Sequence, residues 1–151
     1  MSRGVAGEPL SRRERIDRMR SRAWVVHILY LWESRGADRC LDEAARSVRA
    51  NRRISPSRLP LICEHLERLD EHLEEIDRTI QACMDNWRLE RLSRIDRSIL
   101  RLATSEILYQ PELSPAISIQ EGIRLAGQYG GSDSPRFING ILDAVLRIRS
   151  A

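Results

Sequence analysis

Apolar residues recur at α-helical spacing in segment after segment of this 151-residue chain. The clearest segment lies between residues 62 and 80, where apolar side chains alternate at intervals of four and three residues. They are Ile62, Leu66, Leu69, Leu73, Ile76 and Ile80. That spacing places them on one face of a helix about five turns long. No segment shows the alternation of a half-buried β-strand, so the sequence predicts an all-α protein.

Proline, glycine and capping residues divide the periodic segments into separate helices. Ser11-Arg-Arg-Glu14 matches a capping box, which opens a helix that Gly36 is expected to end. Further helices are predicted over about residues 38–50, from residue 56 or 61 to about 85, over about 93–110, from residue 116 or 118 to 129, and over about 134–151. The sequence therefore predicts a helical bundle of about six to seven helices.

The first of these helices carries an apolar stripe that we expect to face the core. Its residues are Ile16, Met19, Ala23, Val26 and Tyr30. From Ala23 to Trp32 the helix is apolar nearly all round, which predicts a deeply buried second half. This run is about half the length of a membrane span, so no membrane-spanning segment is predicted, and a membrane is not among the expected partners.

The chain length favours a single domain over residues 1–151, with residues 1–10 expected to be flexible. The amino terminus lacks the apolar segment of a secretory signal, which predicts a cytoplasmic location. The cysteines are widely spaced and form no Cys-x-x-Cys pair; they are Cys40, Cys63 and Cys83. That pattern favours reduced thiols over a disulfide framework, and we expect no metal and no cofactor.

Positive charge is concentrated near the amino terminus. The formal net charge is only +3, but residues 1–22 contain seven arginines against three acidic residues. On a helical wheel, five of these arginines form two rows that flank the apolar stripe. One row is Arg15, Arg18 and Arg22, and the other is Arg13 and Arg20. Because guanidinium groups bind phosphate oxygens bidentately, these rows predict a surface that binds nucleic acid.

Two other interpretations of the arginine rows stay open. The arginines can form a solubilising surface whose aliphatic stems cover the core. The helix can also lie on a membrane surface, although burial in the core already accounts for its apolar face.

No arrangement of residues indicates catalysis. The sequence has no Gly-rich phosphate loop, no Gly-x-Ser-x-Gly and no His-Glu-x-x-His. Adjacent carboxylates such as Glu74 and Glu75 fall on the polar face of a regular helix, where nothing desolvates them. We therefore expect a binding protein rather than an enzyme.

The segment from Ser132 to Asp143 places a polar amide and a glycine inside a helix. Apolar residues on both sides of Asn139-Gly140 keep helical spacing, and Pro135 suits a first helical turn. The glycine costs the helix about 1 kcal/mol. It either allows a neighbouring helix to approach closely or serves a function.

Four segments, taken in order, resemble the NusB family of transcription antitermination factors. They are Arg18-x-Arg20-x-Arg22-Ala with Leu29-Tyr30-x-Trp32, Ile95-Asp96-Arg97, Ile119-Gln-Glu121-Gly, and Asp133-Ser-Pro-Arg-Phe137-Ile-Asn139-Gly140-Ile-Leu-Asp143. The resemblance covers residues 12–33 and about 87–146 well, and residues 34–60 poorly. Only the last segment is specific by itself.

The resemblance implies an all-α fold of two three-helix sub-bundles. It also implies binding of the boxA element of ribosomal RNA leader transcripts as single-stranded RNA, jointly with the ribosomal protein NusE in a transcription elongation complex. By position, the implied RNA-binding residues are Arg18, Arg20, Arg22, Tyr30, Asp133 and Phe137, and the implied NusE contact is Asp96. Arg13 and Arg15 extend the basic run, and Asn139 adds an amide near Phe137, so we include these three in the predicted RNA site.

We expect the arginines of the first helix to lie beside the last helix, so that both contact one unpaired RNA strand. Three other functions stay open: a helical module that binds only protein, a helix-turn-helix reader of duplex DNA, and a module resembling the NusB-like domain of certain ribosomal RNA methyltransferases. A helix-turn-helix reader needs an exposed recognition helix rich in Arg, Asn and Gln, and none is evident in this sequence. Both a monomer and a homodimer are compatible with the sequence.

Overall fold

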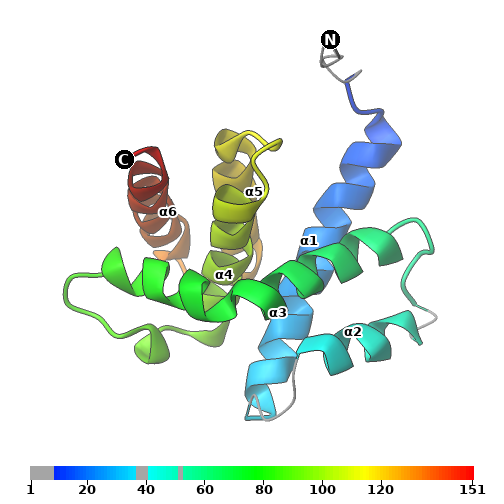
Figure 1. Cartoon of the computed structure of the whole chain (residues 1–151), viewed down its shortest axis with the longest axis horizontal. Helices are drawn as coiled ribbons and strands as arrows, with labels where there is room; N and C mark the ends of the chain where they lie inside the picture. The colour runs from blue at the N-terminus through cyan, green and yellow to red at the C-terminus, as the bar shows by residue number, and fades with distance from the viewer. Residues whose placement is uncertain (1–8, 37–40, 51–52) are drawn as a thin grey trace.

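Six α-helices and one 3-10 turn make up the computed structural model, which describes residues 9–36, 41–50 and 53–151. In chain order they are α1 (Arg12–Ser34), α2 (Leu41–Arg49), α3 (Leu59–Ala82), the 3-10 turn η1 (Leu89–Arg91), α4 (Arg94–Tyr109), α5 (Pro115–Tyr129) and α6 (Ser134–Ser150). No strand occurs in the described ranges, and the predicted all-α class is confirmed (Figure 1). The flexibility expected of residues 1–8 concerns a segment outside the described residues.

Side-chain caps begin α1 and α4 at the predicted places, and a glycine follows the end of α1. The Ser11 hydroxyl accepts a hydrogen bond from the Glu14 backbone N–H at 3.1 Å, and the Glu14 carboxylate accepts one from the Ser11 N–H at 2.8 Å. This reciprocal pair is the predicted capping box of α1. Ser93 caps α4 by accepting from the Asp96 N–H at 3.1 Å. Just beyond α1, Gly36 has a φ of 85°, a left-handed conformation that glycine adopts without strain.

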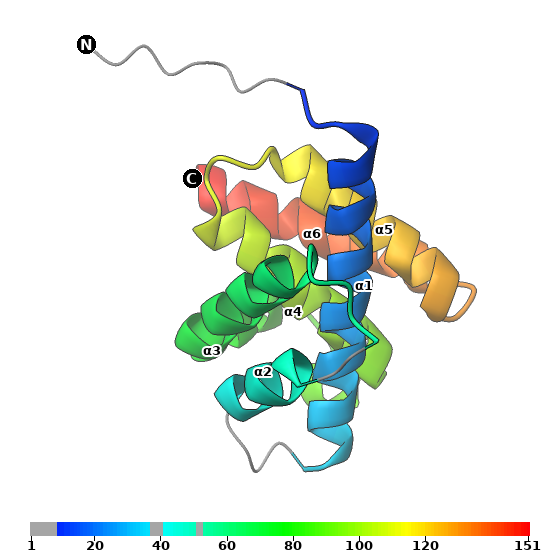
Figure 2. The ribbon, with the colours of Figure 1, turned by 90° about the vertical axis from the view of Figure 1, so that its right-hand side faces the viewer.

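The helices form two groups of three that meet through α4. Helices α1 and α2 pack on α3, whereas α4, α5 and α6 pack on one another. Helix α4 joins the groups because it also packs on α1 and on α3. Figure 1 shows α3 running across α4, with α5 between α1 and α6, and Figure 2 shows α1 extending along one side of the bundle.

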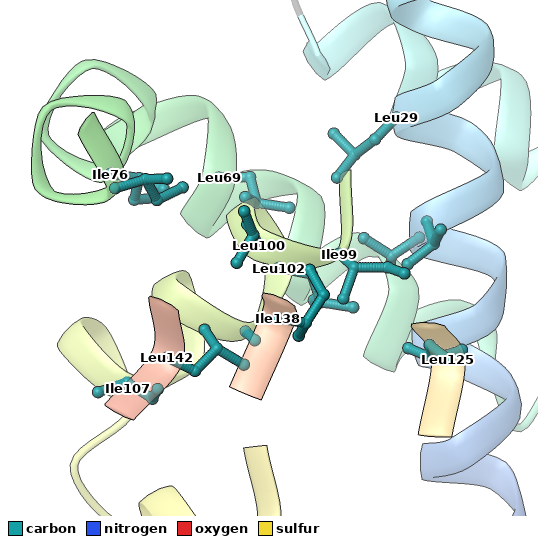
Figure 3. Close-up of a cluster of buried hydrophobic side chains, with 14 of the residues drawn as sticks. Leu29, Leu69, Ile76, Ile99, Leu100, Leu102, Ile107, Leu125, Ile138 and Leu142 are labelled. Atoms are coloured by element: carbon teal, nitrogen blue, oxygen red, sulfur yellow. The ribbon is translucent and has the colours of Figure 1, made fainter. Parts of the chain in front are cut away.

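Helix α4 lies at the centre of the hydrophobic core. Every residue from Ser98 to Ile107 is buried, so this helix has packed neighbours on all its sides. Figure 3 shows side chains from four other helices meeting those of α4. They are Leu29 of α1, Leu69 and Ile76 of α3, Leu125 of α5, and Ile138 and Leu142 of α6.

The apolar stripe of α1 belongs to the core only in its second half. Val25, Val26 and Leu29 are at most 2% exposed, as predicted for that region, but Leu31 is 38% exposed, so the second half is not buried on all sides as its apolar run predicted. The prediction was wrong for the first half, where Ile16 is 38% exposed and Met19 is 36% exposed. The core does not reach the first turns of α1, so arginines and unburied apolar side chains share the surface there.

Gly122, rather than Gly140, lies at a close contact between helices. A β-carbon at Gly122 would lie 3.0 Å from Leu142 Cδ1 and 3.5 Å from Ile138 Cγ2, both on α6. At Gly140, by contrast, no atom of the described residues lies within 4 Å of the corresponding position, apart from its chain neighbours and the backbone of its own helix. The interpretation of Gly140 as a close-packing residue was therefore wrong, because its missing side chain would point into open space.

A network of ion pairs fixes the carboxyl-terminal end of α1 against α3 and α4. The Glu33 carboxylate accepts hydrogen bonds from Arg97 at 2.6 Å and from Arg101. Arg101 also donates to Asp77 at 2.8 and 2.9 Å, and its guanidinium lies 5.7 Å from the centre of the Trp32 ring. Burial alone would lower the pKa of Arg101, but its contacts with Asp77 and Glu33 outweigh burial and raise that pKa.

Candidate nucleic-acid interface

Five arginines give the amino-terminal half of α1 a positively charged surface, here called the arginine ridge. Arg12, Arg13, Arg15 and Arg20 are exposed, and Arg18 is half-buried. Among the described residues, no carboxylate forms an ion pair with any of the five. The guanidinium charges of the ridge are therefore available to an anionic ligand such as a phosphate.

Arg22 has a different environment from the arginines of the ridge. It is 6% exposed, and its guanidinium donates to the Glu106 carboxylate at 2.7 and 3.2 Å. The Ser118 hydroxyl donates to the same carboxylate at 2.7 Å, so this buried contact connects α1, α4 and α5. Turning Arg22 toward a phosphate would leave the Glu106 charge unpaired in the core. We therefore treat Arg22 as a positioning residue and leave it out of the proposed RNA contacts.

Tyr30 lies on the same helix as the ridge but at some distance from it. Ten residues separate Arg20 from Tyr30, which corresponds to about 15 Å along the helix axis. Tyr30 is half-buried. It can contact an RNA bound to the ridge only if the strand continues along α1 toward its carboxyl-terminal half.

The predicted residues of α6 do not all lie on one side of that helix. Phe137 follows Asp133 by one turn, and its N–H donates to the Asp133 carbonyl at 3.1 Å. Asp133 is exposed, whereas Phe137 is half-buried and packs against the core. Asn139 is exposed, but at two residues beyond Phe137 it faces another direction. A single RNA strand can therefore contact Asp133 and the Phe137 edge together more readily than Asn139.

The structure does not place α6 directly beside the arginine ridge as we expected. Helices α1 and α6 both pack on α4, but they are not among the pairs that pack extensively on each other in the described residues. Figure 1 shows α5 between them. The two halves of the predicted RNA surface are held on a common helix, and a strand contacting both has to extend across the width of α4 and α5.

Asp96 lies at the other end of α1 from the arginine ridge. It occupies the first turn of α4, where the neighbouring Arg97 binds Glu33 near the end of α1. Asp96 is half-buried, and its Oδ1 atom is shielded from solvent with no hydrogen-bond partner among the described residues. The arginine ridge and the predicted NusE contact are therefore at opposite ends of α1, and Tyr30 is nearer to the NusE contact.

A cavity of about 210 Å³ adjoins the arginine ridge. Arg18 and Arg22 line it from α1, His65 and Arg68 from α3, and Gln110 and Leu113 from the link between α4 and α5. The sequence prediction missed the last four of these residues. No local pattern marks them, because the cavity exists only where three separate segments come together.

His65 is uncharged at neutral pH. Burial lowers its pKa from 6.5 to about 4; the charge of Glu106 opposes this shift, and three nearby arginines reinforce it. A neutral imidazole has one nitrogen that donates and one that accepts a hydrogen bond. The Nη1 atom of Arg68 lies 3.4 Å from His65 Nδ1. The ring is therefore part of a polar wall that adds no charge of its own.

The described residues include no cluster of side chains suited to hold a metal ion. Cys63 and Cys83 are free thiols, and Cys40 lies outside the described residues. In the same ranges, every helix is too short or too polar to cross a bilayer.

The NusB family pattern matches residues 19–147 of this chain. A transcription antitermination protein NusB from Methylacidiphilum infernorum (isolate V4) is 35% identical over 133 residues, which cover 87% of this chain and 92% of that protein. The solved structure of T. maritima NusB has a TM-score of 0.78 at 29% identity and covers 89% of this chain and 93% of its own. A structure of the antitermination factors NusB and NusE in complex with dsRNA has a TM-score of 0.74 at 24% identity, over 91% of this chain and 99% of the matched chain.

Two sub-bundles joined through α4, together with these matches, define a transcription antitermination factor. The chain belongs to the NusB family.

Proposed function

We propose that this chain binds the boxA element of ribosomal RNA leader transcripts as single-stranded RNA, together with the ribosomal protein NusE. In this proposal the complex joins the transcription elongation machinery in the cytoplasm and promotes processive elongation. The chain contributes binding and positioning, without a catalytic step of its own. The observation that carries the proposal is the arginine ridge, whose guanidinium groups have no partner carboxylate among the described residues.

The ridge has the chemistry needed to bind an RNA backbone. Four of the predicted arginines lie within eight consecutive residues: Arg13, Arg15, Arg18 and Arg20. Contacts between arginine and phosphate supply affinity and position the strand, but they do not select a sequence. A partner that shares the RNA is therefore useful to such a protein. One structural neighbour, in its own complex, is bound to NusE and dsRNA.

The proposed contacts outside the ridge are on α6 and α4. Asp133 and Phe137 would contact the RNA from the start of α6, with Asn139 as a further polar contact. Asp96 would contact NusE at the first turn of α4, because its Oδ1 atom has no hydrogen-bond partner among the described residues.

The test is a binding titration with labelled RNA, in the presence and absence of NusE. Three RNAs are compared: single-stranded boxA, a scrambled strand of the same composition, and a boxA duplex. We expect the highest affinity for single-stranded boxA with NusE present. Equal affinities for boxA and the scrambled strand in the presence of NusE would contradict the proposal.

The second candidate function is a helical module that binds only protein. Charge reversal at Arg13, Arg15, Arg18 and Arg20 separates the two candidates, because it abolishes RNA binding in the first and changes nothing in the second. Arg149→Glu is the matched control, since Arg149 is an exposed arginine near the end of α6. Full NusE affinity combined with undetectable RNA affinity of the unmutated protein would favour the protein-only module.

A further inference from the structure

We propose that the cavity between α1, α3 and the α4–α5 link binds one unpaired base of the RNA, and that Gln110 recognises the edge of this base. This inference rests on the RNA binding proposed above. It adds a site at which the protein distinguishes one RNA sequence from another. The arginine ridge cannot supply that selection, because phosphate contacts are the same for every sequence.

The position of the cavity suits a base whose backbone lies on the ridge. Arg18 belongs to the ridge and also lines the cavity. The volume of about 210 Å³ is smaller than the roughly 300–1,000 Å³ of pockets that enclose drug-sized ligands. A cavity of this size therefore suits one planar ring, with the sugar and phosphate outside.

The walls of the cavity combine the groups that bind unstacked bases. Proteins bind such bases by stacking them on apolar or planar side chains and by hydrogen bonds to the base edges. Leu61 and Leu113 provide apolar surface, and the His65 ring and the Arg68 guanidinium are planar groups. The cavity thus has both apolar and hydrogen-bonding walls.

Gln110 has hydrogen-bonding capacity that the fold does not use. Its Oε1 atom is shielded from solvent and has no hydrogen-bond partner among the described residues. Buried side-chain polar atoms are normally hydrogen-bonded, so this oxygen is an exception. The Gln110 backbone is held by its N–H, which donates to the Glu106 carbonyl at 3.0 Å. Once the side chain turns so that the shielded Oε1 atom reaches the cavity, the amide presents a donor and an acceptor side by side, which matches a base with an adjacent acceptor and donor.

The charges around the cavity favour a neutral base over a second phosphate. The charged residues that line it are Arg18, Arg22, Arg68, Glu64 and Glu112. Two of the arginines already have carboxylate partners, Arg22 with Glu106 and Arg68 with Glu64 at 3.2 Å. His65 adds no charge at neutral pH because burial lowers its pKa to about 4. The lining is therefore close to neutral overall, unlike the ridge.

The experiment is a base-substitution scan of boxA RNA, measured with the full chain and NusE. Each position is changed to the other three bases, and binding is compared for the unmutated protein, Gln110→Ala and Gln110→Glu. We expect one position at which substitution weakens binding of the unmutated protein about tenfold. In Gln110→Ala that position loses its preference, whereas the preferences at all other positions and the affinity for scrambled RNA stay the same.

Two controls separate recognition from folding. Gln110→Ala removes an amide oxygen without a partner, so its thermal midpoint should stay close to that of the unmutated protein. Gln120→Ala removes an exposed glutamine of α5 outside the cavity, and we expect it to keep every base preference. Gln110→Glu retains the side-chain shape, replaces the amide donor by a carboxylate, and should also abolish the preference at that one position.

Several outcomes would overturn the inference. Unchanged preference at every position in both Gln110 variants would show that the cavity does not recognise a base, while leaving RNA binding by the ridge intact. A uniform loss of affinity for all RNAs, with a shallower salt dependence, would instead indicate a phosphate contact. Absence of RNA binding by the unmutated protein would refute the proposed function itself, and this inference with it.

Discussion

Arg20 and Arg22 are two residues apart on α1, and the sequence alone assigns them the same role. Arg20 is exposed, whereas Arg22 is 6% exposed and bound to Glu106. The difference depends on Glu106, which is 84 positions away in the chain. A helical wheel shows which residues flank a stripe, but it does not show which flank meets another helix.

The same substitution is therefore expected to lower stability at Arg22 and to weaken RNA binding at Arg20. Arg22→Gln should lower the free energy of unfolding by about 3 kcal/mol, because it leaves the Glu106 carboxylate buried without a cation. Arg20→Gln should change that free energy by less than about 0.5 kcal/mol but weaken RNA binding. Urea unfolding and RNA titration of both variants measure these effects. Equal stability of the two variants would contradict the assignment of Arg22 as a positioning residue.

His65 predicts a pH dependence of stability. Its pKa is about 4 in the folded protein and about 6.5 when unfolded, so the unfolded chain binds more protons between these values. The contribution of the neutral His65 ring to the free energy of unfolding is fully present above about pH 6.5. It decreases as the pH falls toward 4. At pH 5 the loss should be about 1–2 kcal/mol.

The measurement for His65 is a comparison with His65→Gln by denaturant unfolding at pH 7 and pH 5. The variant lacks the titrating ring, so its stability should decrease less over this interval than that of the unmutated protein. Carboxylates titrate equally in both proteins and cancel in the comparison. The same pH dependence in both would show that His65 does not contribute.

At the scale of the element, α6 contains a glycine that packing does not require. Apart from its chain neighbours and its own helix backbone, a methyl group at Gly140 meets nothing within 4 Å among the described residues. Gly140→Ala should therefore stabilise the protein by about 0.5–1 kcal/mol, because alanine loses less backbone entropy in a helix. The expected rise in the thermal midpoint is about 2 °C, measured by circular dichroism.

Gly122→Ala is the matched comparison on α5. The added methyl would lie 3.0 Å from Leu142 Cδ1, so this side chain must move and the entropic gain is offset. The thermal midpoint of Gly122→Ala should be below that of Gly140→Ala. An equal rise in both variants would mean that the Leu142 side chain moves away from the added methyl group without loss of stability.

Helix boundaries were predictable from the sequence because their causes are local. The capping box of Ser11 and Glu14, the Ser93 cap and the Gly36 stop each depend on residues within one turn. The burial of α1 was only half predictable. Periodicity located its apolar face correctly, but Ile16 and Met19 are exposed because the neighbouring helices do not cover the first turns.

At the scale of the whole molecule, the arginine ridge predicts how RNA binding depends on salt. If Arg13, Arg15, Arg18 and Arg20 neutralise four phosphates, a plot of log affinity against log salt should have a slope of about −3 for single-stranded RNA. Arg20→Gln should make this slope shallower by about 0.7. A slope near zero would remove the ridge from the binding mechanism.

The fold class and the family were predictable, whereas the arrangement of the candidate site was not. Helical periodicity and four ordered segments sufficed for an all-α NusB-family protein. We predicted that the arginines of α1 lie beside α6, and this was wrong because other helices of the bundle separate α1 from α6. Such an arrangement depends on how all six described helices pack. The cavity at Gln110 was missed for the same reason, since its lining comes from three segments of the chain.

The exposure of Ile16 and Met19 has a consequence for backbone motion. Little apolar contact lies beneath them, although an ion pair between Asp17 and Arg58 holds them to the segment before α3. The first turns of α1 can open while the rest of the bundle stays intact, so their amide protons should exchange rapidly with solvent deuterium. Amides of α4, buried on all sides, should exchange only when the whole protein unfolds. Bound RNA should then slow exchange in those first turns and leave the rates of α4 almost unaltered.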